Sequence, residues 1–312
     1  MKFRRSFFKK TSSMQKKKRN AVIFYAVMAA PILLQFLLFY VYVNFNSVSL
    51  AFKTWDPATE SYRFTWFSNI AQVARDIFTE PVLRTSFLNS LIVFAVTLVI
   101  STPLGLLFSY YIYKKKPGYR VFRIFLFLPS IISGIVMAIL FSYMADAVIP
   151  TIVEKWFHVS IQGLLENPKL TFPVLLLYSI WIGFGSSTLL YVGTMGDISD
   201  SVIEAAQIDG AGFFREFFSV VLPSVFPTFV TFTMMSVAGI FSTQLALFDF
   251  YGKGAQVRLY TVGYYLYLNT LDAGMGQYPY LAALGVMLTA VMAPLAFGVK
   301  KLLTRFGPSA DR

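Results

Sequence analysis

Long stretches without a charged side chain are the feature that most restricts the fold of this 312-residue chain. Six runs of about 20 residues or more contain no Lys, Arg, Asp, Glu or His, and each can cross a hydrocarbon core of about 30 Å as a helix. The chain is 56% hydrophobic and 13% charged, whereas soluble domains are about 25% charged. The sequence therefore predicts an all-α, polytopic membrane protein with six transmembrane helices. The predicted spans are Ala21–Val48, Ser86–Tyr113, Ile124–Met144, Thr171–Gly193, Leu222–Phe248 and Tyr280–Val299.

The net charge of +12 is unevenly distributed along the chain. If the N-terminus is cytoplasmic, 19 of the 27 Lys and Arg residues lie on the cytoplasmic side, which is then net +13, while the outer side is net −1. Such an excess of cations beside apolar runs is typical of cytoplasmic loops and not of nucleic-acid binding. We therefore expect a multi-pass protein of the cell membrane with cytoplasmic N- and C-termini.

The order of these segments suggests a division of the chain into four parts. Residues 1–20 form a basic cytoplasmic tail, and residues 21–85 form the first transmembrane helix and an outer loop. Residues 86–303 form the core, and residues 304–312 form a cytoplasmic C-terminal tail. The first apolar run is about 25 residues long and ends without a small-residue cleavage site, so it is expected to stay uncleaved. The chain has no cysteine, which excludes disulfides and thiolate chemistry.

One polar segment, EAAQIDGAGFFREFFSVVLP at residues 204–223, separates the fourth and fifth predicted spans. Its apolar spacing predicts a helix on each side of Gly210, with a positive φ at Gly210 and Asp209 as a cap or turn acceptor. Before the turn, Ile198, Val202, Ala205 and Ala206 are predicted to share one face, and Asp197, Asp200 and Glu204 another. After it, Phe213, Phe214, Phe217, Phe218 and Val221 are predicted to form an apolar stripe opposite Arg215, Glu216 and Ser219.

An amphipathic helix of this kind can lie on lipid headgroups, and that alternative stays open. Its polar face is acidic, however, and the cytoplasmic leaflet is itself anionic and would repel it. A protein partner with a basic groove fits the segment better.

The segment resembles the EAA loop of ABC importer permeases, which reads EAA, three residues, Gly, nine residues, Ile, one residue, Leu-Pro. The matching residues are Glu204, Ala205, Ala206, Gly210, Leu222 and Pro223. Val220 stands where the loop has Ile. The longer form EAAxxDGA, which here includes Asp209 and Ala211 and is followed by the aromatic Phe217, is similar to the carbohydrate-uptake branch.

The resemblance covers the first span and residues 86–301. RFTWFSNIAQVARD with FLNS resembles the outer loop that leads into the core, and FRIFLFLPSIISG resembles the start of the third span. YLYLNTLDAGMGQYPYLAALGVML resembles the approach to the last span. Residues 86–303 would then be an ABC transmembrane type-1 permease core of the maltose-transporter F-subunit type. The large outer insertion and extra N-terminal helices of some such members are absent.

This resemblance implies that the segment is a coupling helix that docks in a cleft of a separate ATPase, with Glu204 facing basic residues. It also implies a second homologous permease, two ATPase subunits and an extracellular sugar-binding protein as partners. The chain itself would bind no cofactor, because ATP and Mg²⁺ belong to the ATPase.

Sequence motifs for chemistry are lacking. No GxxxxGK[ST] phosphate-binding loop occurs, and the single histidine, His158, lies in an outer loop without a second histidine or a cysteine. The hydroxyl side chains have no neighbouring base. We therefore expect neither an enzyme nor a metal site.

A sugar path needs hydroxyl or amide groups and aromatic faces near the bilayer midplane. Small residues also serve close helix packing, and for Gly183, Ser187 and Ser236 this alternative stays open. Thr243 and Gln244 are stronger candidates, because an amide in lipid needs partners. Ser236, Gly239, Ile240 and Thr243 align with sugar contacts of the family. The candidate path residues are Trp181, Gly183, Ser186, Ser187, Ser236, Gly239, Ile240, Thr243 and Gln244.

Three other functions are compatible with the composition. An importer for an amino acid, a polyamine or phosphate is disfavoured because the spans carry no compensating charge. An ion-coupled secondary transporter or a channel is disfavoured because proton coupling needs titratable groups within the membrane. A membrane-embedded assembly factor without transport would be indicated if no ATPase co-purified.

Overall fold

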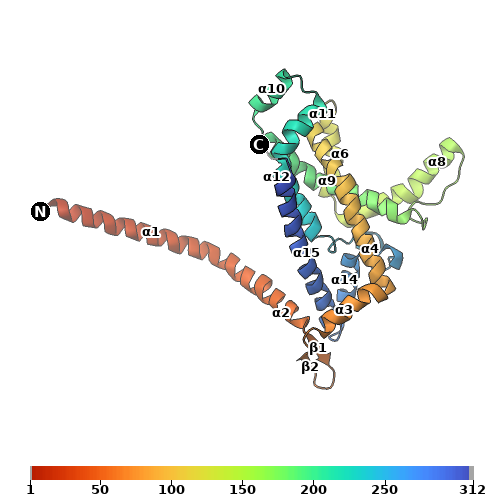
Figure 1. The fold of residues 1–312 in the computed structure, drawn as a ribbon, viewed down its shortest axis with the longest axis horizontal. Coiled ribbons are helices and arrows are strands. Elements are labelled where there is room, and N and C mark those ends of the chain that lie inside the picture. The colour runs from red at the N-terminus through yellow and green to blue at the C-terminus, as the bar shows by residue number, and fades with distance from the viewer. Residues whose placement is uncertain (1, 309–312) are drawn as a thin grey trace. The chain divides into compact units, whose positions relative to one another are not determined.

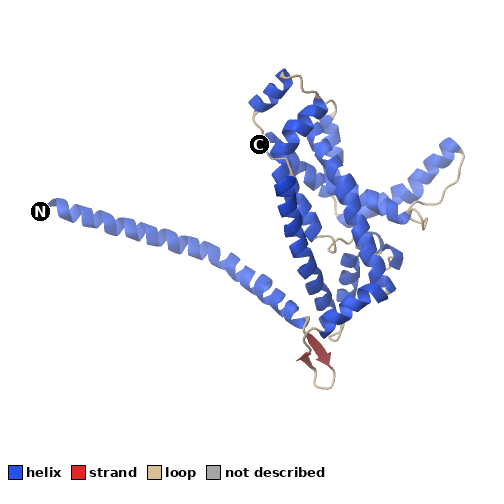
Figure 2. Cartoon of the chain, in the orientation of Figure 1, coloured by secondary structure: helices blue, strands red, loops and turns tan. Residues whose placement is uncertain are grey.

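The computed structural model describes residues 2–308, and the side chains of residues 2–16 and of Ser186 are outside that description. The described chain is mainly helical, with one two-stranded sheet (Figure 2). Six helical stretches are long and apolar enough to cross a membrane, which confirms the predicted all-α, polytopic class. They are Lys17–Leu50, Pro81–Tyr113, Gly134–Phe157, Thr171–Gly196, Phe213–Ala238 and Tyr278–Phe306.

The chain divides into two compact units, Met1–Ile70 with Met275–Val286, and Ala71–Gly274 with Met287–Arg312. The first unit contains α1 (Lys2–Gln35), the π-helical η1 (Phe36–Tyr42), α2 (Val43–Leu50), β1 (Lys53–Asp56) and β2 (Ser61–Phe64). Helix α1 includes most of the segment expected to be a separate tail. Its Lys, Arg, Met and Gln residues favour helix, so the basic segment continues directly into the first span.

The hairpin of the first unit is an element that the all-α prediction lacks. Strands β1 and β2 pair antiparallel, with Lys53 opposite Phe64. The buried Asn69 amide donates to the carbonyl of Ala51 at 3.0 Å and to that of Lys53 at 2.7 Å. These two bonds fix the chain where α2 ends and the hairpin begins.

The second unit holds most of the remaining helices, and Figure 1 shows α10 and α11 towards one end of this unit and α14 towards the other. Helices α3 (Ser68–Thr79) and α15 (Tyr278–Phe306) cross the boundary between the units. The elements within the second unit are α4 (Pro81–Val96), η2 (Thr97–Ser101), α5 (Thr102–Tyr113), α6 (Tyr119–Ile131), α7 (Gly134–Tyr143), η3 (Met144–Val148), α8 (Ile149–Phe157), α9 (Thr171–Gly196), α10 (Asp200–Ile208), α11 (Phe213–Glu216), η4 (Phe217–Val221), α12 (Leu222–Ala238), α13 (Leu247–Tyr251), η5 (Val257–Leu259) and α14 (Val262–Leu271).

The third apolar stretch is not the single helix predicted over Ile124–Met144. Helix α6 ends at Ile131, and Ile132 and Ser133 are extended, with ψ of 145° and 138°. A new helix then runs from Gly134 through η3 to the end of α8. Pro129 lacks an N–H and weakens the last turn of α6, whereas hydropathy is continuous across the break and gives no sign of it.

Span α4–η2–α5 is tied to the segment 258–262 by polar side chains from the FLNS motif. The Asn89 amide donates to the carbonyls of Arg258 and Tyr260 at 2.8 and 2.9 Å. The Ser90 hydroxyl accepts from the Val262 N–H at 3.0 Å. The segment therefore has its backbone groups paired at the start of α14, where they would otherwise be orphaned.

Candidate functional site

The turn after α10 is built on Gly210. Its φ is 75°, the positive value predicted for this position. The Ala211 N–H donates to the Ala206 carbonyl at 2.9 Å, and the Gly210 N–H donates to the Gln207 carbonyl at 3.0 Å. This pair of bonds is a Schellman motif, in which the residue after the cap is left-handed and glycine is favoured. Asp209 is the C-cap residue of α10, and its own N–H donates to the Ala205 carbonyl at 3.0 Å.

Helix α10 is attached to the second unit through one buried side chain, Ile203, which is 7% exposed. Ile203 packs in a cluster with Tyr110, Phe217 and Val221. The predicted apolar face is only partly covered, since Ile198 packs against this cluster and Ala206 is half-buried, whereas Val202 is 47% exposed. Tertiary packing, and not the count of apolar residues, decides which side is covered.

The predicted coupling residues fall into three groups by exposure. Phe217 is buried, Ala206, Ala211, Leu222 and Pro223 are half-buried, and Glu204, Ala205, Asp209 and Gly210 are exposed. Beside the exposed group, Ile208 is 86% exposed. The free surface of α10 thus combines acidic and apolar side chains.

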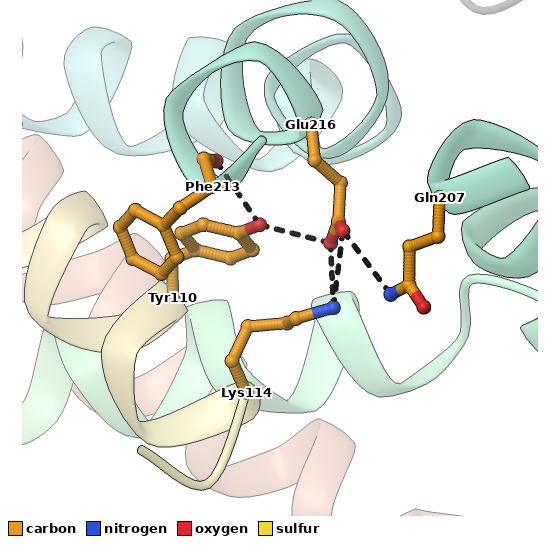
Figure 3. A network of polar contacts seen from close by, with 5 residues as sticks. All are labelled: Tyr110, Lys114, Gln207, Phe213 and Glu216. Carbon is orange, nitrogen blue, oxygen red and sulfur yellow. Dashed lines mark hydrogen bonds and ion pairs between the residues drawn. The ribbon is translucent and has the colours of Figure 1, made fainter. Parts of the chain in front are cut away.

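Glu216 is buried at the centre of a polar network (Figure 3). The Lys114 ammonium lies 2.8 Å from its Oε1 and 3.1 Å from its Oε2. The Tyr110 hydroxyl donates to Oε1 at 2.8 Å, and the Gln207 amide donates to Oε2 at 3.3 Å. Both carboxylate oxygens are therefore paired. The prediction of a polar face containing Glu216 is wrong, because this side chain points into the unit beside Phe217.

The apolar stripe predicted after the turn is only partly buried. Phe217 and Val221 belong to the core, but Phe214 and Phe218 are exposed. The π-helical segment η4 shifts the register by one residue at this point. The stripe counted at ordinary helical spacing therefore splits between core and surface.

A cavity of about 340 Å³ lies among α4, η2, α5, α9, α12 and the segment that follows α12. This volume is at the lower end of the range for small-molecule sites. Eight of the fourteen residues around it carry hydroxyl groups and none is charged. The surrounding residues are Val93, Phe94, Thr97, Ser101, Thr102, Ser179, Gly183, Ser187, Tyr191, Phe232, Ser236, Gly239, Ile240 and Thr243.

Six of the nine candidate path residues meet in this cavity, namely Gly183, Ser187, Ser236, Gly239, Ile240 and Thr243. Trp181 instead packs against the apolar cluster that contains Phe141. Gln244 lies next to the lining, where its carbonyl accepts from the Leu247 N–H at 3.0 Å. Ser186 lies outside the described side chains. Assignment of a substrate to these residues stays a prediction.

Sequence reasoning missed the part of the cavity wall formed by Thr97, Ser101, Thr102, Ser179 and Tyr191. The Tyr191 hydroxyl is buried and has no hydrogen-bond partner among the described residues. Hydroxyl residues one helical turn apart, such as Thr97 and Ser101, are a signal that could have indicated this wall.

Residues 239–246 leave the helical path that was predicted to continue to Phe248. Helix α12 ends at Ala238, and Leu245 and Ala246 have positive φ values of 52° and 54°. The Thr261 hydroxyl holds this segment by donating to the Thr243 carbonyl at 2.7 Å. Helix α14 approaches it at Gly263, where a Cβ would lie 2.5 Å from the Ser242 and Thr243 carbonyl oxygens. Irregular backbone at membrane depth is tolerated where it lines a cavity.

No group of three or more His, Asp or Glu side chains that could hold a metal ion is found among the described residues. His158 is exposed and caps the end of α8 with a φ of 53°.

These features define a class, that of a polytopic helical membrane protein with an uncharged polar cavity and a helix–turn–helix exposed at one end. Residues 101–310 match the family described as binding-protein-dependent transport system inner membrane component. The chain belongs to this family. It is therefore a permease subunit of an ABC importer that works with a binding protein, and it is not an enzyme, since the ATPase of such a system is a separate subunit.

Curated relatives support this assignment. The arabinooligosaccharides transport system permease protein AraP of Halalkalibacterium halodurans is 26% identical over 85% of this chain and 83% of its own length. The multiple sugar-binding transport system permease protein MsmF of Streptococcus mutans is 23% identical over 89% and 94%. The sn-glycerol-3-phosphate transport system permease protein UgpA of Yersinia pestis is 25% identical over 72% and 75%.

The fold is shared with a chain of a bacterial ABC transporter involved in the import of the acidic polysaccharide alginate. The TM-score is 0.77 at 19% identity, over 94% of this chain and 99% of that one. A second structure of an alginate transporter, in complex with a periplasmic protein that carries an alginate pentasaccharide, gives a TM-score of 0.75 at 18% identity.

Proposed function

We propose that this chain forms half of the translocation path of an ABC importer for a neutral sugar or oligosaccharide. The observation that carries the proposal is the cavity wall, in which hydroxyl groups are numerous and charged groups are absent. Hydroxyl groups both donate and accept hydrogen bonds, as the hydroxyl groups of a sugar do.

The charge of the substrate distinguishes a neutral sugar from the charged solutes named for some similar proteins. A phosphate ester or a uronate brings a negative charge, which needs a cation or helix dipoles inside the membrane. None of the residues that line the cavity supplies a cation. The relatives AraP and MsmF, whose names state arabinooligosaccharides and multiple sugars, support a neutral carbohydrate.

The exposed part of α10 supports the role of residues 204–223 as the contact with an ATPase. Glu204, Asp209 and the apolar Ile208 are open to solvent, while Phe217 and Val221 anchor the segment in the core. A cleft with basic residues would pair with Glu204, and the small side chains of Ala205 and Ala206 would allow close approach.

The remaining subunits follow from this arrangement. A second, homologous permease would supply the other half of the path, and two ATPase subunits would bind ATP and Mg²⁺. An extracellular sugar-binding protein would deliver the substrate to the outer loops. The distribution of Lys and Arg supports cytoplasmic N- and C-termini.

Transport by the purified complex tests the substrate class. Subunits that co-purify with this chain in mild detergent are reconstituted in liposomes with internal ATP, and the cognate binding protein is added outside. Uptake of labelled arabinotriose, maltotriose, alginate trisaccharide and sn-glycerol 3-phosphate is then measured. We expect ATP-dependent uptake of a neutral oligosaccharide. Uptake of only the charged probes would contradict the proposal, and a preparation without ATP is the control.

A further inference from the structure

Glu216 is the only charged side chain that is buried among the residues the structure describes. Burial of a carboxylate is costly unless its oxygens are paired, and here Lys114, Tyr110 and Gln207 pair both of them. A buried ion pair is seldom more stabilising than apolar residues of the same volume. It does restrict geometry, because few arrangements satisfy all of its groups at once.

The network joins three elements of the second unit. Gln207 belongs to α10, Glu216 ends α11, and Tyr110 and Lys114 stand at the end of α5. Lys114 and Glu216 are 102 positions apart in the chain. The carboxylate therefore connects α10 and α11, the two helices of the proposed coupling segment at residues 204–223, to a transmembrane span that is remote in sequence.

Helix α5 leads from this network to the cavity. Its first residue, Thr102, and the preceding Ser101 belong to the cavity wall. Twelve helical residues from Thr102 to Tyr113 extend about 18 Å at 1.5 Å per residue. Helix α5 thus connects the polar network around Glu216 at one of its ends to the cavity wall at the other.

A second connection is covalent. The chain runs from Glu216 through η4 into α12, which reaches the cavity at Ser236. Without the ion pair, movement of the coupling segment would be passed to α12 through the backbone. It would be passed to α5 only through apolar contacts, such as that between the Tyr110 and Phe213 rings, whose centroids are 4.5 Å apart, and through the 3.3 Å bond from the Tyr110 hydroxyl to the Phe213 carbonyl.

We propose that the Lys114–Glu216 ion pair, oriented by Tyr110 and Gln207, locks the coupling segment to α5, so that both walls of the path move together when the ATPase moves the segment. This inference rests on the proposed function. Glu216 and Lys114 are positioning residues in this scheme, and neither contacts the substrate cavity.

Distances between spin labels test the lock directly. The chain has no cysteine, so cysteines introduced at the exposed Ser201 of α10 and Lys115 after α5 are the sole labelling sites of this subunit. The label separation is measured by electron paramagnetic resonance in the reconstituted complex, without nucleotide and with ADP and vanadate. We expect the same narrow distance in both states for the unchanged network.

The variants Lys114→Met and Glu216→Gln are expected to broaden or shift this distance in at least one nucleotide state. In the same variants, the amount of sugar taken up per ATP hydrolysed should fall by about 5- to 150-fold, the range of a typical allosteric coupling. The matched control is Lys253→Met, which breaks the exposed ion pair between Lys253 and Asp272, with side chains 55% and 62% exposed. That variant should leave the label distance unchanged.

Exchange of the two charges separates a lock from general stability. The variant with both Lys114→Glu and Glu216→Lys is expected to restore the narrow label distance. Its distance tests the proposed lock even if a single variant fails to assemble. A broad distance in the exchanged variant, or an unchanged narrow distance in both single variants, would overturn the proposal. The distance readout needs no transported sugar, so a wrong substrate class leaves its result intact.

Discussion

At the scale of single residues, the backbone at Gly210 sets the shape of the coupling segment. Its φ of 75° costs an L-residue about 1–2 kcal/mol. Gly210→Ala should therefore loosen the turn after α10, and amide hydrogen exchange in residues 200–212 should become faster. Gly212→Ala is the matched control, since Gly212 has a φ of −70° and open space around its Cβ position. Equal exchange in the two variants would contradict the Schellman assignment.

Asn89 is a second residue with a defined structural task. Replacement by Leu would leave the carbonyls of Arg258 and Tyr260 without their donor, at about 1–3 kcal/mol for a buried unsatisfied group. A lower midpoint of thermal unfolding in detergent is expected. Asn269→Leu is the control, because the Asn269 amide donates only to the Tyr265 carbonyl one turn earlier in its own helix. An equal fall of the midpoint in both variants would contradict a specific stabilising role for the hydrogen bonds that the Asn89 side chain donates.

Single residues differ in how far their structural role can be predicted from the sequence. The positive φ of Gly210 follows from its place between two helical patterns. Six path residues follow from small and hydroxyl-bearing positions in apolar spans together with the resemblance to the permease family. Burial of Glu216 could not be predicted, because its partner Lys114 lies 102 positions away. In a single sequence, a charged residue opposite an apolar stripe indicates solvent.

At the scale of elements, apolar runs predict the number of spans but not their interruptions. The fourth span is predicted well, since Thr171–Gly193 lies within α9, whereas the break at Ile132 and Ser133 lies in an unbroken apolar stretch. Hydropathy shows which stretches are apolar and gives no information about where backbone hydrogen bonds are interrupted. The hairpin β1–β2 is missed because short strands in a loop have little periodicity.

Close contact between α14 and the irregular segment 239–246 predicts a strong effect at Gly263. A methyl group there would lie 2.5 Å from the Ser242 and Thr243 carbonyl oxygens, so α14 or the segment must move. Gly263→Ala is expected to lower both thermal stability and uptake. Gly193→Ala in α9, with no atom within 4 Å of the added group, should change neither. Normal uptake in Gly263→Ala would show that the segment does not shape the path.

Two neighbouring residues of α12 separate the cavity from the lipid-facing surface. Ser236 belongs to the cavity wall, and Met235 is 62% exposed. Ser236→Phe should fill part of the cavity and abolish most sugar uptake while the complex still assembles. Met235→Phe places the same phenylalanine side chain outside the cavity and should transport normally. Equal transport by the two variants would place the path elsewhere.

At the scale of the whole molecule, we infer that binding, transport and energy supply are divided between this chain and its partners. The chain carries an uncharged polar cavity, and in the proposed assembly α10 would contact an ATPase subunit while a binding protein would capture the substrate. Orientation rests on the excess of Lys and Arg on one side. The exposed surface of α10 is acidic, although the proposed topology puts it on that basic side, which is the reason to expect a basic groove on the ATPase.

ATP-driven uptake of a neutral oligosaccharide by Glu204 variants is the most direct test of this account. Glu204 is exposed on α10, so its replacement should leave folding and membrane insertion intact. Glu204→Lys is predicted to abolish uptake, because two basic surfaces would then face each other, while Glu204→Asp keeps the charge and should retain most of it. Full uptake in Glu204→Lys, at equal amounts of assembled complex, would contradict the central claim.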